Sequence, residues 1–199
     1  MPKLRVIPGG SAHQELGDSE LVRAFSAGDS PAFGQLIKRH QETVFRVVRR
    51  YAQSADEARD LTQRAFLQAL EATERAPLSS DVPFKAWVLR IAINLGKNHV
   101  RDAVRRTELS AGDAPRPPMT LADEAFEKAE QEALTRRAVL ELPARQREVF
   151  MLRIDAGLPF AEVASTLGIT EGNAKAHFHH AVKRLKEEVA KLSAPGGTS

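Results

Sequence analysis

The stretch Phe160-Ala-Glu-Val-Ala-Ser-Thr-Leu-Gly-Ile-Thr-Glu171, near the end of the 199-residue sequence, decides the fold. Its apolar residues recur at helical steps as far as Leu167, which is typical of a short helix. Gly168 suits a turn that needs a positive φ, and Thr170 is a favoured cap for a second helix that runs to about Leu192. Two helices joined in this way form a helix-turn-helix. This segment alone leaves an ordinary antiparallel helical hairpin open as the alternative.

The rest of the chain is also expected to be helical, so the predicted fold class is all-α. Ala, Leu, Glu, Arg and Lys dominate the sequence, and apolar and polar residues nowhere alternate as they do in a strand. Helical spacing begins near Asp18, Ser30, Ser54 and Phe84. Ser54 and the glutamate three residues later are spaced as in a capping box, which marks the start of one of these helices.

Composition divides the chain into two small helical domains joined by a flexible linker. Prolines and glycine gather between Glu108 and Thr120, and such a composition cannot pack a core. The predicted organisation is a disordered tail over 1–17, a first domain over 18–107, an acidic proline-rich linker over 108–133, a helix-turn-helix domain over 134–192 and a disordered tail over 193–199.

Charge is distributed unevenly along these segments. The formal net charge is only +3, but residues 85–106 hold six Lys or Arg against one acid, and residues 107–133 hold two against seven acids. The last helix, over 171–186, has four bases against one acid. Two basic surfaces separated by an acidic segment indicate a polyanion that is contacted at two places, although such charges can also simply solvate helix faces.

Several classes of protein are disfavoured by what the sequence lacks. Cysteine is absent, so neither disulfides nor thiolate metal sites are available, and a reducing cytoplasm is the expected compartment. No apolar run is long enough to span a bilayer, so no membrane insertion is expected. There is no nucleophile with a base, no glycine-rich phosphate loop and no metal quartet, so we expect neither an enzyme nor a cofactor.

Three segments carry a resemblance to a known family. The stretches Glu57-Ala-Arg-Asp-Leu-Thr-Gln-Arg-Ala-Phe-Leu-Gln-Ala-Leu70, Phe84-Lys-Ala-Trp-Val-Leu-Arg-Ile-Ala-Ile-Asn-Leu-Gly-Lys-Asn-His-Val-Arg101 and Leu142-Pro-Ala-Arg-Gln-Arg-Glu-Val-Phe-Met-Leu-Arg153 occur in the order found in extracytoplasmic-function sigma factors. The chain resembles this subfamily of sigma-70 factors over most of its length. The resemblance implies a subunit that binds core RNA polymerase, directs it to promoters and performs no bond chemistry itself.

The resemblance implies three sets of functional residues. Asp60, Gln63 and Phe66 would dock on the clamp helices of the polymerase's largest subunit. The loop over 75–83 would receive a base flipped out of the −10 element. The −10 element would be bound by Arg90, Asn94, Lys97, Asn98 and Arg101, and the −35 element by Asn173, Lys175, His177 and His180.

The recognition helix departs from the family's pattern. Where members commonly have Gly-Thr-Val-Lys-Ser-Arg, this chain has Gly172-Asn-Ala-Lys-Ala-His177, and His180 replaces an arginine that often follows. A mostly neutral imidazole cannot reproduce the bidentate contact of a guanidinium with guanine, so these changes affect specificity. His177 and His180 also share a helix face, but no nearby cysteine or carboxylate completes a tetrahedral metal site, and DNA contacts explain them better.

Promoter DNA and core RNA polymerase are therefore the expected partners, and the family suggests an anti-sigma protein as a regulator. The alternative function is a helix-turn-helix regulator that binds DNA without polymerase. The helix over 57–70 distinguishes the two hypotheses, because a free-standing regulator has no use for the surface of Asp60, Gln63 and Phe66.

Overall fold

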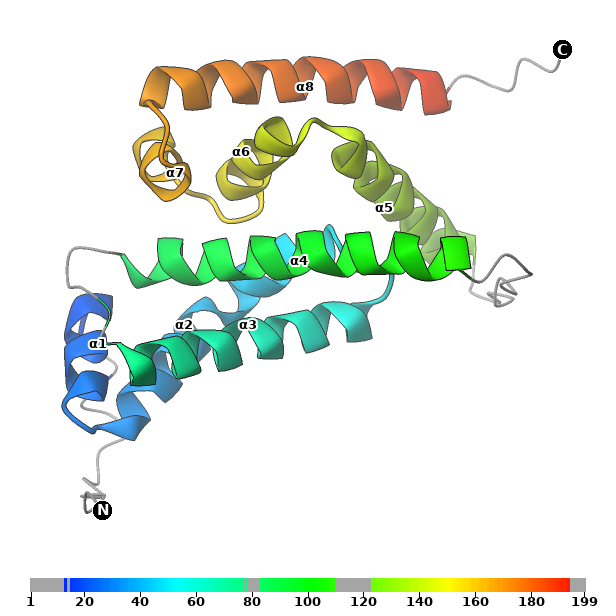
Figure 1. Cartoon of the computed structure of the whole chain (residues 1–199). Helices are drawn as coiled ribbons and strands as arrows, with labels where there is room; N and C mark the ends of the chain where they lie inside the picture. The colour runs from blue at the N-terminus through cyan, green and yellow to red at the C-terminus, as the bar shows by residue number, and fades with distance from the viewer. Residues whose placement is uncertain (1–12, 14, 77, 79–82, 110–122, 194–199) are drawn as a thin grey trace, which may run out of the picture. The chain divides into compact units, whose positions relative to one another are not determined.

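The structure is a computed structural model that describes residues 13, 15–76, 78, 83–109 and 123–193. Every regular element in these residues is an α-helix, which confirms the all-α fold class. The helices are α1 (Asp18–Ser26), α2 (Ser30–Arg49), α3 (Ala55–Arg75), α4 (Phe84–Leu109), α5 (Asp123–Glu141), α6 (Ala144–Ile154), α7 (Phe160–Leu167) and α8 (Glu171–Ser193), as Figure 1 shows.

Helix α3 begins at the cap that the sequence predicts. The backbone N–H of Glu57 donates to Ser54 Oγ at 3.1 Å, and the backbone N–H of Gln53 donates to the Glu57 carboxylate at 2.7 Å. These bonds satisfy backbone donors that a helix start otherwise leaves without an intrahelical acceptor. The predicted capping role of Ser54 is therefore confirmed.

Contacts divide the chain into two compact units, and the division falls inside α4, between Gly96 and Lys97. In the first unit α2 packs against both α1 and α3 (Figure 1). The structure buries Leu36 of α2, Leu61 of α3 and Val88 of α4 almost completely, with at most 1 % of the surface of each residue exposed. Burying one such side chain stabilises a fold by about 1.5–3 kcal/mol, so this shared core holds the four helical segments in register.

The second unit is built around α8, which contacts α5, α6 and α7. Val139 of α5, Leu152 of α6 and Ala181 of α8 are completely buried. Phe178 of α8 lies between two other rings, with centroid distances of 6.2 Å to Phe150 and 5.5 Å to Phe160. The apolar side of α8 is therefore packed against the preceding helices.

Helical structure reaches into both ends of the segment that composition predicts to be a linker. Helix α4 continues to Leu109, and α5 begins at Asp123, because residues 123–133 consist largely of good helix formers such as Ala and Glu. Residues 110–122, which hold the prolines, lie outside the described residues.

One residue of the segment predicted to be a disordered tail, His13, is buried in the structure. His13 is only 6 % exposed, and its Nε2 lies 2.6 Å from Asp29 Oδ2, just beyond the end of α1. The carboxylate gives this buried imidazole a hydrogen-bonding partner. Residues 1–12 and 194–199 lie outside the described residues.

Candidate nucleic-acid interface

The turn between α7 and α8 has the geometry that the sequence predicts for a helix-turn-helix. Gly168 ends α7 with φ of 64°, in the left-handed region that favours glycine. The N–H of Ile169 donates to the Ala164 carbonyl at 3.0 Å, and the N–H of Asn173 donates to Thr170 Oγ1 at 3.2 Å. The first bond closes α7 and the second caps α8, so the angle between the two helices is fixed by local hydrogen bonds.

The predicted −35 residues lie mainly on the exposed side of α8. Asn173, Lys175 and His180 are exposed, whereas His177 is half-buried. The Nζ of Lys175 pairs with Glu171 Oε1 at 2.7 Å. This ion pair is on the surface and contributes little to stability, so the lysine can exchange its partner for a phosphate at small cost.

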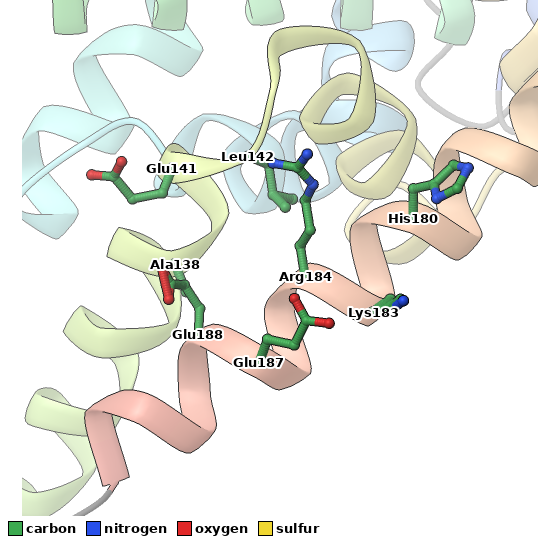
Figure 2. A pocket seen from close by; sticks show the side chains of 8 residues that line it. All are labelled: Ala138, Glu141, Leu142, His180, Lys183, Arg184, Glu187 and Glu188. Atoms are coloured by element: carbon green, nitrogen blue, oxygen red, sulfur yellow. The ribbon is translucent and has the colours of Figure 1, made fainter.

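Lys175 and His180, both expected at the −35 element, lie on different sides of α8. Five residues of an α-helix turn through about 500°, which leaves the two side chains about 140° apart. His180 instead lines a cavity of about 390 Å³ between α5 and α8 (Figure 2). Its position at this cavity depends on how α5 packs, and the spacing within α8 could not predict it.

The cavity itself combines charges of both signs. From α8 it is lined by His180, Lys183, Arg184, Glu187 and Glu188, and from the end of α5 and the residue after it by Ala138, Glu141 and Leu142. Cationic and anionic side chains are about equal in number, so the cavity does not select an anion or a cation by net charge. It carries no indication of a particular ligand.

The predicted −10 residues form an accessible stripe along α4. Arg90, Asn94, Asn98 and Arg101 are exposed, and Lys97 is half-buried. They are spaced by three and four residues, and therefore lie within an arc of about 100° on the helix. The opposite side of the helix is apolar and buried, with Val88, Leu89, Ala92, Ile93 and Leu95. Arg101 Nε lies 3.7 Å from Asp102 Oδ1 in a weak surface pair.

The loop predicted to receive a flipped base lies mostly outside the described residues. The helix that follows it is anchored by rings: the Phe84 ring centroid is 6.0 Å from that of Phe33 and 5.8 Å from that of His40. Trp87 is half-buried, with its centroid 5.9 Å from that of Phe84. This aromatic packing fixes the start of α4 relative to α2.

The three residues predicted to dock on the polymerase lie at different depths on α3. Asp60 and Gln63 are exposed, but Phe66 is only 5 % exposed and packs in the core. Three-residue steps drift by about 60° each, so by Phe66 the side chain has turned about 120° away from Asp60. Leu67, seven residues after Asp60, returns to the same face and is 57 % exposed. The seven-residue spacing between Asp60 and Leu67, which is about two helical turns, is the sequence signal that places Leu67 on this face.

Two features are absent from the part of the chain that the structure describes. Among the described side chains, no group of three or more His, Cys, Asp or Glu is placed to hold a metal ion. Within the described residues, none of the helices combines the length and the apolar character that crossing a bilayer requires.

Comparisons with known proteins place both units in one family. The family model of sigma-70 region 2 matches residues 36–106, and that of sigma-70 region 4 matches residues 133–185, together more than half of the chain. The ECF RNA polymerase sigma factor BldN of Streptomyces coelicolor is 33 % identical over 83 % of this chain and 63 % of its own length. The chain belongs to the extracytoplasmic-function subfamily of sigma-70 factors.

Other relatives of this sigma factor are similar over nearly their whole length. RNA polymerase sigma-H factor of Pseudomonas aeruginosa is 28 % identical, over 89 % of this chain and 94 % of the relative. ECF RNA polymerase sigma-E factor of Escherichia coli is 27 % identical, over 90 % and 97 %. The resemblance that the sequence motifs indicate is therefore confirmed.

Solved structures confirm the fold of the sigma factor. The structure of CnrH in complex with the cytosolic domain of CnrY aligns with a TM-score of 0.68 at 23 % identity, over 88 % of this chain and 99 % of that one. The sigma factor RpoE of Bartonella quintana, in complex with the anti-sigma factor NepR, aligns with a TM-score of 0.57 at 22 % identity, over 79 % and 96 %.

Family membership decides between the two functions that the sequence analysis considers. Regions 2 and 4 of the sigma-70 family both match this chain, and its relatives are RNA polymerase sigma factors, which supports a role with polymerase in promoter-specific initiation of transcription. The sigma factor accordingly acts with polymerase at promoters, and the alternative of a regulator that works without polymerase is not favoured.

Proposed function

We propose that this sigma factor binds core RNA polymerase through the exposed face of α3 and positions it on promoters through α4 and α8. It has no catalytic activity of its own, and its place of action is the cytoplasm, where the polymerase transcribes. We further propose that residues 18–107 and 134–192 act as separate functional domains, one for the −10 element and the polymerase, the other for the −35 element.

The observation that carries the polymerase contact is the exposed leucine of α3. Leu67 is 57 % exposed, and it lies on the same face as Asp60 and Gln63. The opposite side of α3 already supplies core residues such as Leu61 and Ala65. An exposed apolar side chain beside two polar ones on the same helix face matches the apolar centre and polar rim of protein interfaces, so this face favours a protein partner.

Asp60 and Gln63 give this face its polar contacts. Asp60 Oδ2 lies 3.6 Å from Arg64 Nη1 in an exposed pair that is longer than a hydrogen bond, so its carboxylate can accept bonds from a partner. Phe66 has a supporting role, because its burial beneath this face fixes the rotation of α3. We propose that the three surface residues dock on the clamp helices of the largest polymerase subunit.

On DNA, α4 and α8 have different tasks. The stripe of Arg90, Asn94, Lys97, Asn98 and Arg101 combines cations for phosphates with amides that can bind base edges, and the loop before it is proposed to hold the flipped base of the −10 element. The start of α8, with Asn173, Lys175 and His177, is proposed to enter the major groove of the −35 element. His180 is proposed to contact DNA only at the edge of that surface, because it also lines the cavity beside α5.

The test is capture of purified core polymerase followed by run-off transcription. Replacing Asp60, Gln63 and Leu67 together with alanine should reduce capture at least tenfold and abolish run-off transcripts, while circular dichroism stays unchanged. Gln68→Ala is the matched control, because Gln68 is an exposed amide on the same helix, about 140° from Gln63. Full capture by the triple variant, or equal loss in the control, contradicts the assignment.

An anti-sigma protein is a further proposed partner. The support is that the RpoE of Bartonella quintana, which has the same fold, was solved with the anti-sigma factor NepR. Such a protein would have to cover the α3 face or the DNA-binding helices. A candidate that binds this sigma factor yet leaves both polymerase capture and run-off transcription unchanged would not have this role.

A further inference from the structure

The basic stripe of α4 does not end at Arg101, the last residue that the sequence pattern assigns to it. Arg105 lies one turn further along the helix, and Arg106 follows it. Relative to Arg90, the side chain of Arg105 is rotated by about 60° and falls within the arc of the stripe, whereas that of Arg106 is rotated by about 160° and falls outside it. Both arginines are exposed.

The charge of Arg105 is not used within the described part of the protein. Arg101 has Asp102 at 3.7 Å, but Arg105 makes no ion pair or hydrogen bond with any described residue. An exposed guanidinium without a partner is common on a protein surface. The informative feature is its register, which continues a row of DNA-facing side chains.

The length of the row limits what Arg105 can reach. Arg90 and Arg101 are separated by about 16 Å along the helix axis, and Arg90 and Arg105 by about 22 Å. One strand of B-DNA rises about 3.4 Å per nucleotide, so the first span corresponds to about five steps and the second to about six or seven. Arg105 therefore reaches one or two steps beyond the nucleotides that the rest of the stripe covers.

The direction of the helix then indicates the state of the DNA at that point. In the proposed function, which this inference presupposes, the loop before Phe84 holds the flipped base, so strand separation occurs at the N-terminal end of α4. Arg105 lies at the opposite end, next to DNA that is still paired. Unlike Arg90 and Arg101, which alternate with Asn94 and Asn98, Arg105 has no amide neighbour on the stripe that could bind a base edge.

We propose that Arg105 binds a backbone phosphate of duplex DNA beyond the melted bases, and so fixes the register of α4 on the promoter. A phosphate contact is independent of sequence and neutralises one charge of the DNA. It should appear as about one unit in the slope of log affinity against log salt concentration. It should also persist when the −10 strands are separated in advance, because the contact lies outside them.

The experiment uses holoenzyme, formed from core polymerase and the full chain, on a promoter recovered by selection from random DNA with the wild type. Arg105→Ala, Arg105→Lys and Arg106→Ala are compared at 50–200 mM salt, on the duplex and on the same DNA with a mismatched −10 region. Arg105→Ala should lower the salt slope by about one unit, so that its deficit shrinks about three- to fourfold between the two salt limits. Arg105→Lys should keep the wild-type slope, because it retains the charge.

Arg106→Ala is the matched control, with the same charge removed about 100° away on the helix. Equal effects of Arg105→Ala and Arg106→Ala would show a general effect of net charge and would overturn the proposal. The proposal would also be overturned if Arg105→Ala left the salt slope unchanged, or if mismatched DNA restored wild-type affinity to this variant. An altered base preference of Arg105→Ala within the −10 element would overturn it as well. If wild-type holoenzyme binds the promoter no better than core polymerase alone, the proposed function itself fails; if it does bind and Arg105→Ala matches it, this inference alone fails.

Discussion

Asp18, the first residue of α1, shows how one carboxylate holds two helices together. Its two oxygens lie 2.6 Å from Arg39 Nη1 and 2.6 Å from His40 Nε2, both on α2. Burial disfavours the charged carboxylate and raises its pKa, but the hydrogen bonds and charges of His40 and Arg39 outweigh burial, so the pKa of Asp18 is lowered from its ordinary value of 3.8. The folded state therefore favours the ionised form more than the unfolded state does.

Asp18→Asn should destabilise the protein at neutral pH and have little effect in acid. A carboxyl with a lowered folded pKa contributes stability above its unfolded pKa, and this contribution is lost as the pH falls through the folded pKa. We expect a loss of about 1 kcal/mol at pH 7 that shrinks as the pH falls below 3.8 and through the lowered folded pKa. Urea unfolding between pH 3 and 7 measures it. Glu42→Gln, at a carboxylate that is 81 % exposed, should change stability little at any pH, and a pH-independent effect of Asp18→Asn would contradict this account.

Two residues at the start of α8 should differ in how they affect promoter binding. Lys175→Ala should weaken binding to many −35 sequences and lower the salt slope by about one unit, as expected for a lost phosphate contact. His177→Arg introduces a bidentate donor and should shift the preference toward guanine at one position, where a good pair discriminates by about 1–3 kcal/mol. Selection from a −35 library with each holoenzyme tests both.

Lys186→Ala serves as the control for Lys175→Ala. Lys186 is also exposed, at nearly the same rotation about α8 but about 16 Å further along it, and its loss should leave −35 binding nearly unchanged. If His177→Arg selects the wild-type sequence and Lys175→Ala changes it at a single base, the two roles are reversed.

At the scale of whole helices, α4 lies against the ring of Tyr51, two residues after the end of α2, at a position where α4 has no side chain. A Cβ added to Gly96 would lie 2.1 Å from Tyr51 Cδ2, far inside van der Waals contact. Tyr51 itself is only 3 % exposed and follows the end of α2, so its ring cannot move aside into solvent. The glycine is needed for this close approach of α4 to the Tyr51 ring.

Gly96→Ala should therefore destabilise the first unit, by about 1–3 kcal/mol, even though alanine is the better helix former. Gly34→Ala is the matched control, because Gly34 also lies inside a helix and nothing lies within 4 Å of the position of its added Cβ. There the higher helix propensity should stabilise the protein by up to about 1 kcal/mol. Urea unfolding of the two variants should give opposite signs, and two stabilising results would show that Tyr51 yields without strain.

Helix α3 shows what periodicity can and cannot assign. The spacing within residues 57–70 predicts the helix, its cap at Ser54 and the apolar side with Leu61. It does not tell how wide the buried side is, because that depends on how α2 packs against it. Phe66 lies at the border, and the packing of α2 places it in the core, while Leu67 remains outside.

For the whole molecule, the two compact units should unfold independently. We expect that Leu36→Ala, in the first unit, and Leu152→Ala, in the second, each lower the stability of their own unit by about 2–5 kcal/mol, because both leucines are fully buried. Trp87 is the only tryptophan in the sequence and lies in the first unit, so its fluorescence reports on that unit alone.

The two substitutions should therefore affect Trp87 fluorescence and circular dichroism differently. Leu36→Ala should shift the urea midpoint of Trp87 fluorescence, and Leu152→Ala should leave that midpoint unchanged while shifting part of the circular dichroism transition. If Leu152→Ala shifts the fluorescence midpoint as much as Leu36→Ala does, the chain unfolds as one cooperative unit and the proposal of separate domains is wrong.

The sequence by itself determined the class of helices, the helix-turn-helix and the family, because these depend on local chemistry: Ser54 and Thr170 cap helices, and Gly168 takes a positive φ, through contacts with near neighbours in the chain. Only the tertiary structure decided which polar and apolar positions remain on the surface. Phe66 is buried, Leu67 is exposed and His180 borders a cavity because α2 and α5 cover particular arcs of their neighbours. The burial of a side chain depends on residues that are distant in the sequence. The pattern within one helix does not show which of these residues pack against it.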